Sequence, residues 1–312
     1  MVNHLLSVEE LGTQKLMSLV DRALTLAHND HGNKHTLKDK VVGIYFRCSS
    51  TRTRTAFSVG AMKLGARIIS FGPSDLQLVT GETIQDTARV LANYLNALVI
   101  RTYDSIEEMR AMAMQNDMAI INALSDLEHP TQSIADLVTI KEIFGRLHDI
   151  HVLYIGDGNT TAAALALAVA QIKGMRLTIV TPEGYGLPDS IMSKVAALAA
   201  PSGTFISQQH DLDELPNDVD AVYTARWQTM GVPKSEPEWQ KKFAPYKVTT
   251  ELMRRVSKSP KTVFLHDLPA VRGGDVDDEV LDGPQSHAFR QAYHKMTSAM
   301  AVLEWSMGVK VS

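Results

Sequence analysis

Short apolar runs alternate with longer segments of helical periodicity along the whole chain. The runs have strand length and are rich in β-branched and aromatic residues. They cover residues 41–46, 66–71, 97–101 and 118–123 in the first half of the chain and 151–156, 176–180, 203–207, 221–225 and 262–266 in the second. Strands that are apolar on both faces and alternate with helices are typical of parallel sheets covered on both sides. The pattern therefore predicts an α/β protein with two doubly wound parallel-sheet domains.

The segments between these runs predict helices. The first helix is expected over residues 7–27, and later helices are expected to begin near Thr53, Thr83, Ser105 and Pro130. Pro130 suits a first helical turn, where its missing N–H costs no hydrogen bond. A last helix is expected over residues 285–308 and should pack back on the first domain.

The length of the chain also indicates two domains. Single hydrophobic cores stop growing near ~250–300 residues, and this chain has 312. We place the boundary near residues 145–151. The first domain then covers residues 1–148 and the second covers residues 149–284.

Composition narrows the class of protein. The formal net charge of -4 argues against a general nucleic-acid binder, so any basic site must be local. Cys48 is the only cysteine, which excludes a disulfide framework and favours a reducing cytoplasm. No apolar run reaches the ~18 residues of a membrane span, and the first residues lack the pattern of a signal peptide. We expect a cytoplasmic protein that acts without nucleic acid or membrane.

Polar and charged clusters follow five of the predicted strands. They lie at residues 50–54, 101, 129–132, 224–231 and 266–269. Ligands of open α/β sheets bind beyond the carboxyl ends of the strands. Five clusters at equivalent positions therefore predict a ligand site built from several strand ends.

The cluster at residues 50–54, "STRTR", carries three hydroxyl groups and two arginines at a strand-to-helix turn. The first N–H groups of a helix lack intrahelical partners and lie at the positive end of its dipole. A phosphate fits such a site, with hydroxyl groups as donors and arginine as a bidentate partner. The alternative is an ordinary N-cap followed by two solvated arginines, since Ser and Thr are common caps.

Together, "STRTR", Arg101, "HPTQ" at 129–132 and "HDLPAVRGGDVDDEVLDGPQ" at 266–285 resemble the aspartate and ornithine carbamoyltransferase family. The stretches "GETIQDTARVL" and "DEVLDGPQS" are more similar to the ornithine branch. The resemblance implies two α/β domains with a cleft between them and a homotrimer with active sites at subunit contacts. It also implies carbamoyl phosphate and a small amine as substrates, with no metal or organic cofactor.

The resemblance assigns a set of residues to carbamoyl phosphate: Ser50, Thr51, Arg52, Thr53, Gln77, Arg101, His129, Gln132, Leu268 and Lys295. Gln77 matches a residue that reaches the site of a neighbouring subunit, and Lys295 stands where the family has an arginine. Attack of an amine on the carbamoyl carbon builds negative charge on its oxygen, which fixed polar and cationic donors stabilise. Arg101, His129 and Asp267 are the expected catalytic residues.

The acceptor half departs from the ornithine pattern. Ala163 and Ala225 stand where ornithine enzymes have Asn and Asp, and Asp267 replaces a cysteine. Arg226 and Gln228 match a spacing by which aspartate enzymes bind a carboxylate. The expected acceptor-binding residues are Arg226, Gln228, Thr229, Met230, Asp267 and Leu268.

We therefore expect a carbamoyltransferase acting on an amine other than ornithine. Ornithine with compensating contacts and a non-catalytic paralogue remain alternatives. A dinucleotide-dependent oxidoreductase is disfavoured, because "GDGNTT" at 156–161 lacks the third glycine of the fingerprint. Single residues have alternatives too: His129 as a helix cap, Gln77 as a surface residue and Asp267 as a cap or ion-pair partner. We expect Trp227 to be a hydrophobic wall of the site.

Overall fold

A computed structural model describes residues 2–28, 35–229 and 232–309. The chain divides into two compact units. Unit 1 combines Met1–Val138 with Tyr293–Ser312, and unit 2 is Thr139–Ala292. The functional limits placed at residues 148 and 149 stay a prediction, because compactness does not say which residues bind which substrate.

Unit 1 is built on a sheet of four parallel strands in the order β2-β1-β3-β4. The strands are β1 (Val41–Phe46), β2 (Arg67–Phe71), β3 (Ala97–Arg101) and β4 (Ala119–Leu124). The helices of its first part are α1 (Gly12–His28), α2 (Thr51–Lys63), η1 (Gln77–Thr80), α3 (Ile84–Leu91), α4 (Ile106–Met112) and the start of α5 (Pro130–Phe144). The predicted strand-helix alternation is thus confirmed for this half.

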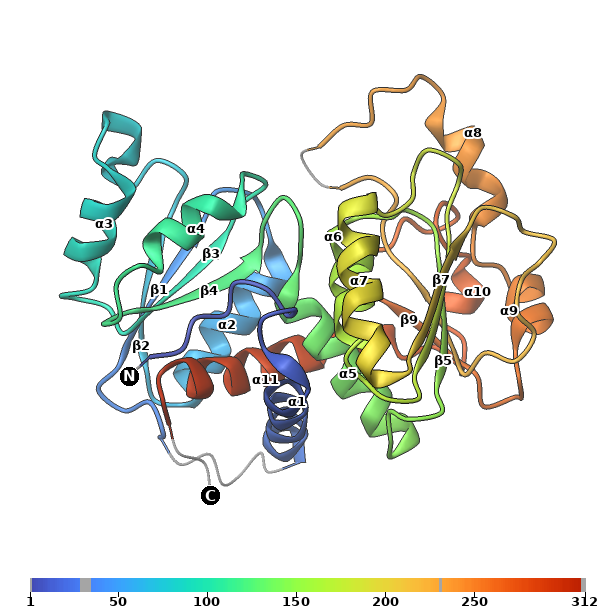
Figure 1. Ribbon diagram of the computed structural model, residues 1–312, viewed down its shortest axis with the longest axis horizontal. Helices are drawn as coiled ribbons and strands as arrows, with labels where there is room; N and C mark the ends of the chain where they lie inside the picture. The colour runs from blue at the N-terminus through green and yellow to red at the C-terminus, as the bar shows by residue number, and fades with distance from the viewer. Residues whose placement is uncertain (1, 29–34, 230–231, 310–312) are drawn as a thin grey trace. The chain divides into compact units, whose positions relative to one another are not determined.

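Helices cover both faces of the central strands of unit 1 (Figure 1). On one face, Met109 and Met112 of α4 belong to a buried cluster with Leu98 and Ile100 of β3. On the other lie α2 and α11 (Ala288–Ser306). A Cβ on Gly60 of α2 would come within 3.0 Å of the Met300 side chain of α11, so the two helices pack closely there.

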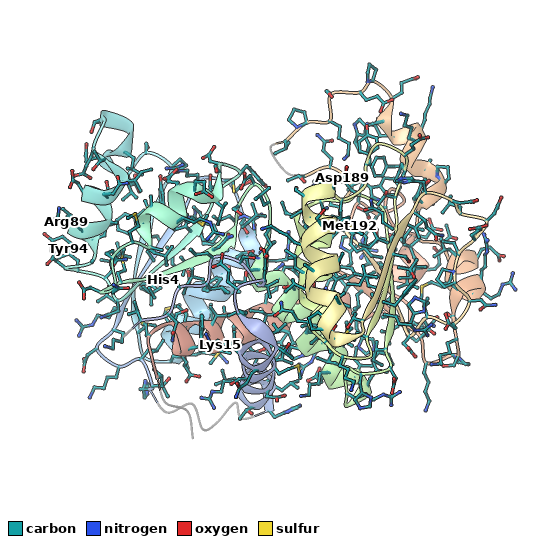
Figure 2. The ribbon with its side chains drawn as sticks, in the orientation of Figure 1. His4, Lys15, Arg89, Tyr94, Asp189 and Met192 are labelled. Carbon is teal, nitrogen blue, oxygen red and sulfur yellow. The ribbon has the colours of Figure 1, made fainter. Side chains whose placement is uncertain are left out.

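The prediction that every strand is covered on both faces is wrong for β2, an edge strand of unit 1. Arg67, Ile69 and Ser70 of β2 are exposed, and none of the five β2 residues is fully buried. The reason is position, because β2 pairs with β1 alone and lies at the rim of the covering helices. Tyr94, just beyond α3, is exposed as well, and Figure 2 shows it with Arg89 at the outer end of this helix.

The first helix begins at Gly12, so the prediction of a start at residue 7 is wrong. The preceding segment is extended, because Leu5 forms a parallel bridge with Ile121 beside β4. Its chain then turns, and the N–H of Val8 donates to the Glu128 carboxylate at 2.8 Å. Contacts with residues far along the chain, at Ile121 and Glu128, thus hold this segment outside the helix.

Unit 2 contains five parallel strands in the order β7-β6-β5-β8-β9. They are β5 (His151–Ile155), β6 (Arg176–Val180), β7 (Phe205–Gln209), β8 (Ala221–Thr224) and β9 (Val263–His266). Its helices are α6 (Thr160–Val169), α7 (Asp189–Ser202), α8 (Trp239–Phe243), η2 (Ala244–Tyr246), α9 (Thr250–Val256) and α10 (Asp278–Leu281). Figure 1 places α6 and α7 on one side of this sheet and α9 and α10 on the other.

The strand predicted over residues 203–207 begins later, at Phe205. Gly203 instead ends α7 in a left-handed conformation, with φ of 66°, where a glycine is favoured as a helix stop. The other predicted strands agree with the structure to within one or two residues at their ends. The predicted fold class, two α/β units with parallel sheets, is confirmed.

Both sheets reverse their strand order next to their first strand. In unit 1 this point lies between β1 and β3, and in unit 2 between β5 and β8. Such switch points leave a crevice at the carboxyl ends of the strands, where ligands bind. The predicted cluster at residues 50–54 follows β1, Arg101 is the last residue of β3, and the segment from Ala225 onward follows β8. Among the described residues, no helix is long and apolar enough to cross a membrane.

Candidate active site

The turn predicted to hold a phosphate lies between β1 and α2. Ser50 occupies the N-cap position of α2 with an extended backbone, and its side chain makes no capping hydrogen bond. The capping alternative for this hydroxyl is therefore not supported. Thr53 is buried, Arg52 is half-buried and Thr51 is exposed. The N-terminal N–H groups of this 13-residue helix, which lack intrahelical partners, thus lie beside three hydroxyl side chains and the guanidinium group of Arg52.

Arg54, the second arginine of the turn, has a different environment. Its guanidinium carbon lies 5.2 Å from the centre of the Phe46 ring at the end of β1. A cation over an aromatic face is attracted by the ring quadrupole. Arg54 therefore supports the turn by packing, which agrees with its exclusion from the predicted ligands.

Arg101 and His129 meet in the buried part of unit 1. The Nη1 atom of Arg101 lies 3.3 Å from Nε2 of His129, and both residues are about 95% buried. Arg101 is placed by an irregularity in the β3–β4 ladder, which shifts its partner to Leu124. His129 directly precedes α5. The alternative that its imidazole only caps that helix is not favoured, because the ring contacts Arg101.

The pKa of His129 is held well below 6.5, first by burial and then by the positive charges of Arg101 and Lys295. The ring is therefore neutral near pH 7. An arginine N–H can only donate, so Nε2 of His129 accepts in this contact. The site thus combines a fixed cation with a neutral imidazole, an arrangement suited to binding the polar group of a substrate.

A second buried chain of contacts runs from α11 to α5. The ammonium of Lys295 donates to Oε1 of Gln132, and Nε2 of Gln132 donates to Asp136 at 2.6 Å. Gln132 and Asp136 are fully buried. The lysine that replaces the family's arginine therefore lies beside a predicted carbamoyl-binding residue, and the amide of Gln132 connects it to Asp136.

Gln77, the predicted cross-subunit residue, is exposed at the start of η1. Its amide oxygen accepts a hydrogen bond from the Thr80 hydroxyl at 2.8 Å. The role of Gln77 stays a prediction, and so does the role of every other residue predicted to bind a substrate.

In unit 2, Asp267 follows β9 and lies next to the start of α6. Its Oδ2 atom accepts from the Thr161 hydroxyl at 2.9 Å. Ala163 and Ala225 are buried and apolar, so neither position offers a polar group. The described acceptor residues therefore include one carboxylate, Asp267, and one guanidinium, Arg226.

Arg226 and Gln228 line a cavity of about 510 Å³ that lies wholly in unit 2. Its other lining residues are Trp227, Trp239, Gln240, Ala244, Lys247, Val271, Gly273, Gly274 and Asp275. The Nε atom of Arg226 is buried and has no hydrogen-bond partner among the described residues. Cavities of ~300–1,000 Å³ with mostly apolar walls and few polar groups are typical of small-molecule sites. Thr229 is half-buried but does not line this cavity, and Met230 lies outside the described residues.

The loop after β9 is held by two buried residues that the sequence did not single out for this purpose. Nδ1 of His266 accepts from the N–H of Leu268 at 2.8 Å. Asp275, which is also buried, accepts from the N–H of Val271 at 3.0 Å. The Leu268–Pro269 peptide bond is cis. These contacts define the backbone on either side of Leu268, the predicted shared ligand.

Asp157 and Lys234 are two further residues that sequence reasoning missed. Asp157 follows β5 directly after Gly156, so the strand-end rule that found the other clusters would have found it. Lys234 lies 77 positions further along the chain, and no local pattern connects the two.

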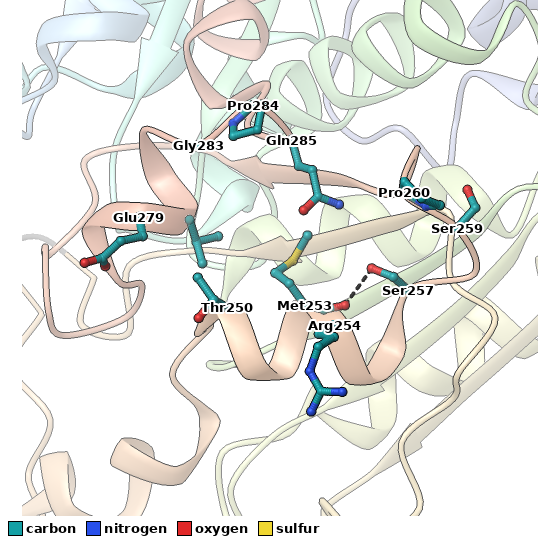
Figure 3. Close-up of a pocket in the computed structure, with 11 residues that line it drawn as sticks. Thr250, Met253, Arg254, Ser257, Ser259, Pro260, Glu279, Gly283, Pro284 and Gln285 are labelled. Atoms are coloured by element: carbon teal, nitrogen blue, oxygen red, sulfur yellow. Dashed lines mark hydrogen bonds between the residues drawn. The ribbon is translucent and has the colours of Figure 1, made fainter.

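A second cavity of unit 2, of about 410 Å³, is shown in Figure 3. It lies between α9 and the segment around α10, and Arg254 and Glu279 are its charged lining residues. None of the predicted site residues lines it. Among the described residues, no group of three or more His, Cys, Asp or Glu side chains is arranged to hold a metal ion.

Two family models match the chain. The model described as "Aspartate/ornithine carbamoyltransferase, carbamoyl-P binding domain" matches residues 3–142, and the model for the "Asp/Orn binding domain" matches residues 148–306. A protein named ornithine carbamoyltransferase from Caldicellulosiruptor saccharolyticus is 39% identical over 304 residues, which are 97% of each chain. One of the same name from Bacillus cereus is 36% identical over 299 residues, 96% of this chain and 92% of its own.

Solved structures are similar as well. The ornithine carbamoyltransferase from Pyrococcus furiosus has a TM-score of 0.91 and 33% identity, covering 99% of this chain and 98% of that one. The ornithine transcarbamoylase from Giardia lamblia has a TM-score of 0.88 and 28% identity, with both chains covered completely, at 100%.

Proposed function

The chain belongs to the aspartate/ornithine carbamoyltransferase family, and we propose that it transfers the carbamoyl group of carbamoyl phosphate to ornithine. Unit 1 binds carbamoyl phosphate in this proposal, and unit 2 binds the amine. The observation that carries the donor half is the buried contact between Arg101 and His129 at 3.3 Å. Burial of a guanidinium beside a neutral imidazole is costly for folding alone and is explained by a polar ligand.

In the proposed reaction, the neutral amine attacks the carbamoyl carbon and a C–N bond forms. Negative charge builds on the carbamoyl oxygen, where Arg101 and His129 stabilise it. The bond from carbon to the phosphate oxygen then breaks. Arg52 and the N-terminus of α2 stabilise the departing phosphate. The proton lost by the attacking nitrogen leaves with the phosphate, which balances the reaction without a further reactant.

The names of the relatives support ornithine as the acceptor, rather than the different amine that the sequence analysis favoured. Proteins with that name are 36–39% identical to this chain over nearly its full length. Ornithine would need compensating contacts in place of the side chains missing at Ala163 and Ala225. We assign its carboxylate to Arg226 and its ammonium group to Asp267. Arginine and carboxylate form paired, planar hydrogen bonds.

A different amine remains the second candidate, because the acceptor half differs from the ornithine pattern at several positions together. Ala163 and Ala225 are buried among apolar groups and cannot bind a charged end of ornithine. Arg226 instead lines the cavity of about 510 Å³ beside two tryptophans. An amine with its anionic group further from the reacting nitrogen would suit this arrangement.

We also propose that the protein is a homotrimer in the cytoplasm. The exposed apolar residues Met62, Ile69, Val90 and Tyr94 of unit 1 support an interface between copies of the chain. The exposed position of Gln77 supports its reach toward a neighbouring subunit. The single cysteine supports a reducing compartment.

An assay of phosphate release from carbamoyl phosphate separates the two acceptor candidates. Ornithine should be the best substrate in a panel of amino acids, diamines and ω-amino acids at equal concentration. If another amine has a kcat/KM about tenfold or more above that of ornithine, the second candidate, a different amine as acceptor, is favoured. No turnover with any amine would contradict both.

A further inference from the structure

Lys234 lies in a cage of one carboxylate and three aromatic rings in unit 2. Its ammonium is 2.6 Å from Oδ1 of Asp157. It also lies 4.5 Å from the ring centre of Tyr185, 4.8 Å from that of Phe243 and 5.7 Å from that of Trp239. The side chains of Lys234 and Asp157 are only 12% and 11% exposed. A cation in such a cage is held both by its counter-ion and by the faces of the rings.

The cage is part of the wall of the Arg226 cavity. Trp239, one of the cage rings, lines that cavity. Trp227, a second lining residue, packs on Phe243 of the cage with ring centres 5.3 Å apart. Trp239 packs on the same ring at 5.5 Å. Phe243 therefore connects the ammonium of Lys234 to both tryptophans of the cavity.

Asp157 fixes the other end of the connection to the sheet. It follows β5, and its carbonyl accepts from the Tyr154 hydroxyl at 2.8 Å. The next turn contains Asn159, which caps α6 and donates to the carbonyl of Arg226 at 3.4 Å. The ion pair thus attaches Lys234 to the turn after β5, and Asn159 of the same turn contacts the backbone of Arg226 after β8.

We propose that the Asp157–Lys234 ion pair positions the acceptor site: it holds Trp227 and Trp239 in place and so orients Arg226 toward the amine substrate. This inference rests on the proposed function only in taking the Arg226 cavity as the acceptor site. Asp157 and Lys234 are positioning residues in it, since they act on the substrate through the aromatic wall.

The electrostatics give this device a pH dependence. Burial raises the pKa of Asp157 to about 6, although the neighbouring ammonium of Lys234 opposes the shift. Of the other charged groups at the cage, Glu236 accepts from the Tyr185 hydroxyl at 2.8 Å and pairs with Lys242 at 2.6 Å. Above about pH 6 the carboxylate of Asp157 is charged and attracts Lys234, and below it the attraction is lost.

The first test compares Lys234→Met with Lys234→Arg in steady-state kinetics near pH 8. Lys234→Met should raise the KM for the amine by about tenfold or more and leave the KM for carbamoyl phosphate within about threefold. Lys234→Arg should recover part of this loss, because a guanidinium also pairs with carboxylate and stacks on rings. Lys241→Met is the matched control, since Lys241 is an exposed lysine of α8 that pairs only with Glu238 among the described residues. An unchanged KM for the amine, or an equal rise for both substrates, would contradict the proposal.

Lys234→Met leaves a buried carboxylate without its partner, which can prevent folding. The double variant Asp157→Asn/Lys234→Met removes both charges and should fold. It should show the same selective rise in the KM for the amine. If this variant folds and binds the amine as the wild type does, the ion pair does not position the site.

The second test does not depend on catalysis. The chain has three tryptophans, and Trp305→Phe leaves Trp227 and Trp239 as the only fluorescent indoles. Their emission should change with a midpoint near pH 6 in the otherwise native protein and show no such transition with Asp157→Asn. A transition that persists with Asp157→Asn, or none in the native cage, would contradict the proposal. A normal transition in a protein that carbamoylates no amine would refute the proposed function and leave the cage standing.

Discussion

Arg101 directs Nη1 at Nε2 of His129 across 3.3 Å in the buried part of unit 1. The contact links the end of β3 to the start of α5, which are separated by 28 positions in the sequence. Burial, and after it the nearby positive charges of Arg101 and Lys295, lowers the pKa of His129 and keeps the imidazole neutral. The contact occupies one N–H of the guanidinium group, which has other N–H groups for further acceptors. This pair is the part of the donor site in which geometry and charge most clearly agree with the proposed chemistry.

Arg52→Ala should abolish turnover and leave the fold intact. The variant removes a guanidinium group that we propose to bind the phosphate, at a half-buried position in the first turn of α2. We expect kcat/KM to fall by about 10³-fold or more and the melting temperature to stay within about 2 °C. Lys63→Ala, in the last turn of the same helix, is the matched control. Turnover within about tenfold of the wild type would remove Arg52 from the site.

His129→Asn should change how stability depends on pH. The pKa of His129 is lowered in the folded state. Below about pH 6.5 the unfolded chain therefore binds a proton at this histidine, whereas the folded protein does not. The wild type therefore loses stability from this group as the pH falls below that value. The variant lacks this loss, and the difference in unfolding free energy between the two should move in its favour on acidification. Urea unfolding at several pH values measures the difference, and a constant difference from about pH 8 to pH 5 would contradict the assignment.

Glu128→Gln, at the residue before His129, should show the opposite dependence of stability on pH. Burial raises the pKa of Glu128 to about 7, against the hydrogen bonds from Ser7 and the N–H of Val8. A raised carboxyl pKa gives stability that is present below the unfolded value and is lost as the pH rises through the folded one. The glutamine variant keeps an acceptor for Val8 and should be more stable than the wild type by up to about 3 kcal/mol near pH 8. The gain should vanish near pH 4, and a variant less stable than the wild type at pH 8 would show the carboxylate to be preferred.

A mixture of Arg52→Ala and Gln77→Ala chains tests the shared site. If Gln77 serves a neighbouring subunit, each variant alone should be nearly inactive. Mixed trimers, refolded or co-expressed, should regain activity, because some of their sites contain neither change. Light scattering should give three times the mass of one chain, or a multiple of that. A monomer at micromolar concentration, or mixtures as inactive as the single variants, would exclude the shared site.

Arg226→Lys should weaken binding of the amine more than binding of carbamoyl phosphate. Lysine keeps the charge but cannot form the paired, planar contacts of a guanidinium with a carboxylate. We expect the KM for the amine to rise by about tenfold and the KM for carbamoyl phosphate to change little. Equal effects on the two constants would remove Arg226 from the acceptor site.

The parts of the fold that the sequence predicts well are those encoded locally. The strands that begin at Val41 and His151 were predictable because nearly every residue in them is buried, so the sequence shows a continuous apolar run. The extended segment at Leu5 was not predictable in this way, since its pairing with Ile121 lies far away in the chain. The prediction that β2 is covered on both faces was wrong for a related reason, because the sequence of an apolar strand does not show whether the strand lies at the edge of its sheet.

The same limit applies to the site. Arg101, His129 and the turn at Ser50 were found because each lies at the carboxyl end of a predicted strand or within a few residues after it. Lys234 belongs to no such pattern, and only the fold brings it to Asp157. Lys295 and Gln132 are separated by 163 positions in the sequence. Only the family resemblance, and no local pattern, placed both in one site.

The most direct test of the account is the formation of labelled citrulline from ¹³C-carbamoyl phosphate and ornithine, followed by NMR or mass spectrometry. The wild type should form it together with an equal amount of phosphate, with a kcat/KM for ornithine of about 10⁴ M⁻¹s⁻¹ or more. Arg101→Met, which removes the guanidinium beside His129, should form none above the uncatalysed rate. Absence of labelled citrulline with the folded wild type, or equal formation by Arg101→Met, would contradict the account.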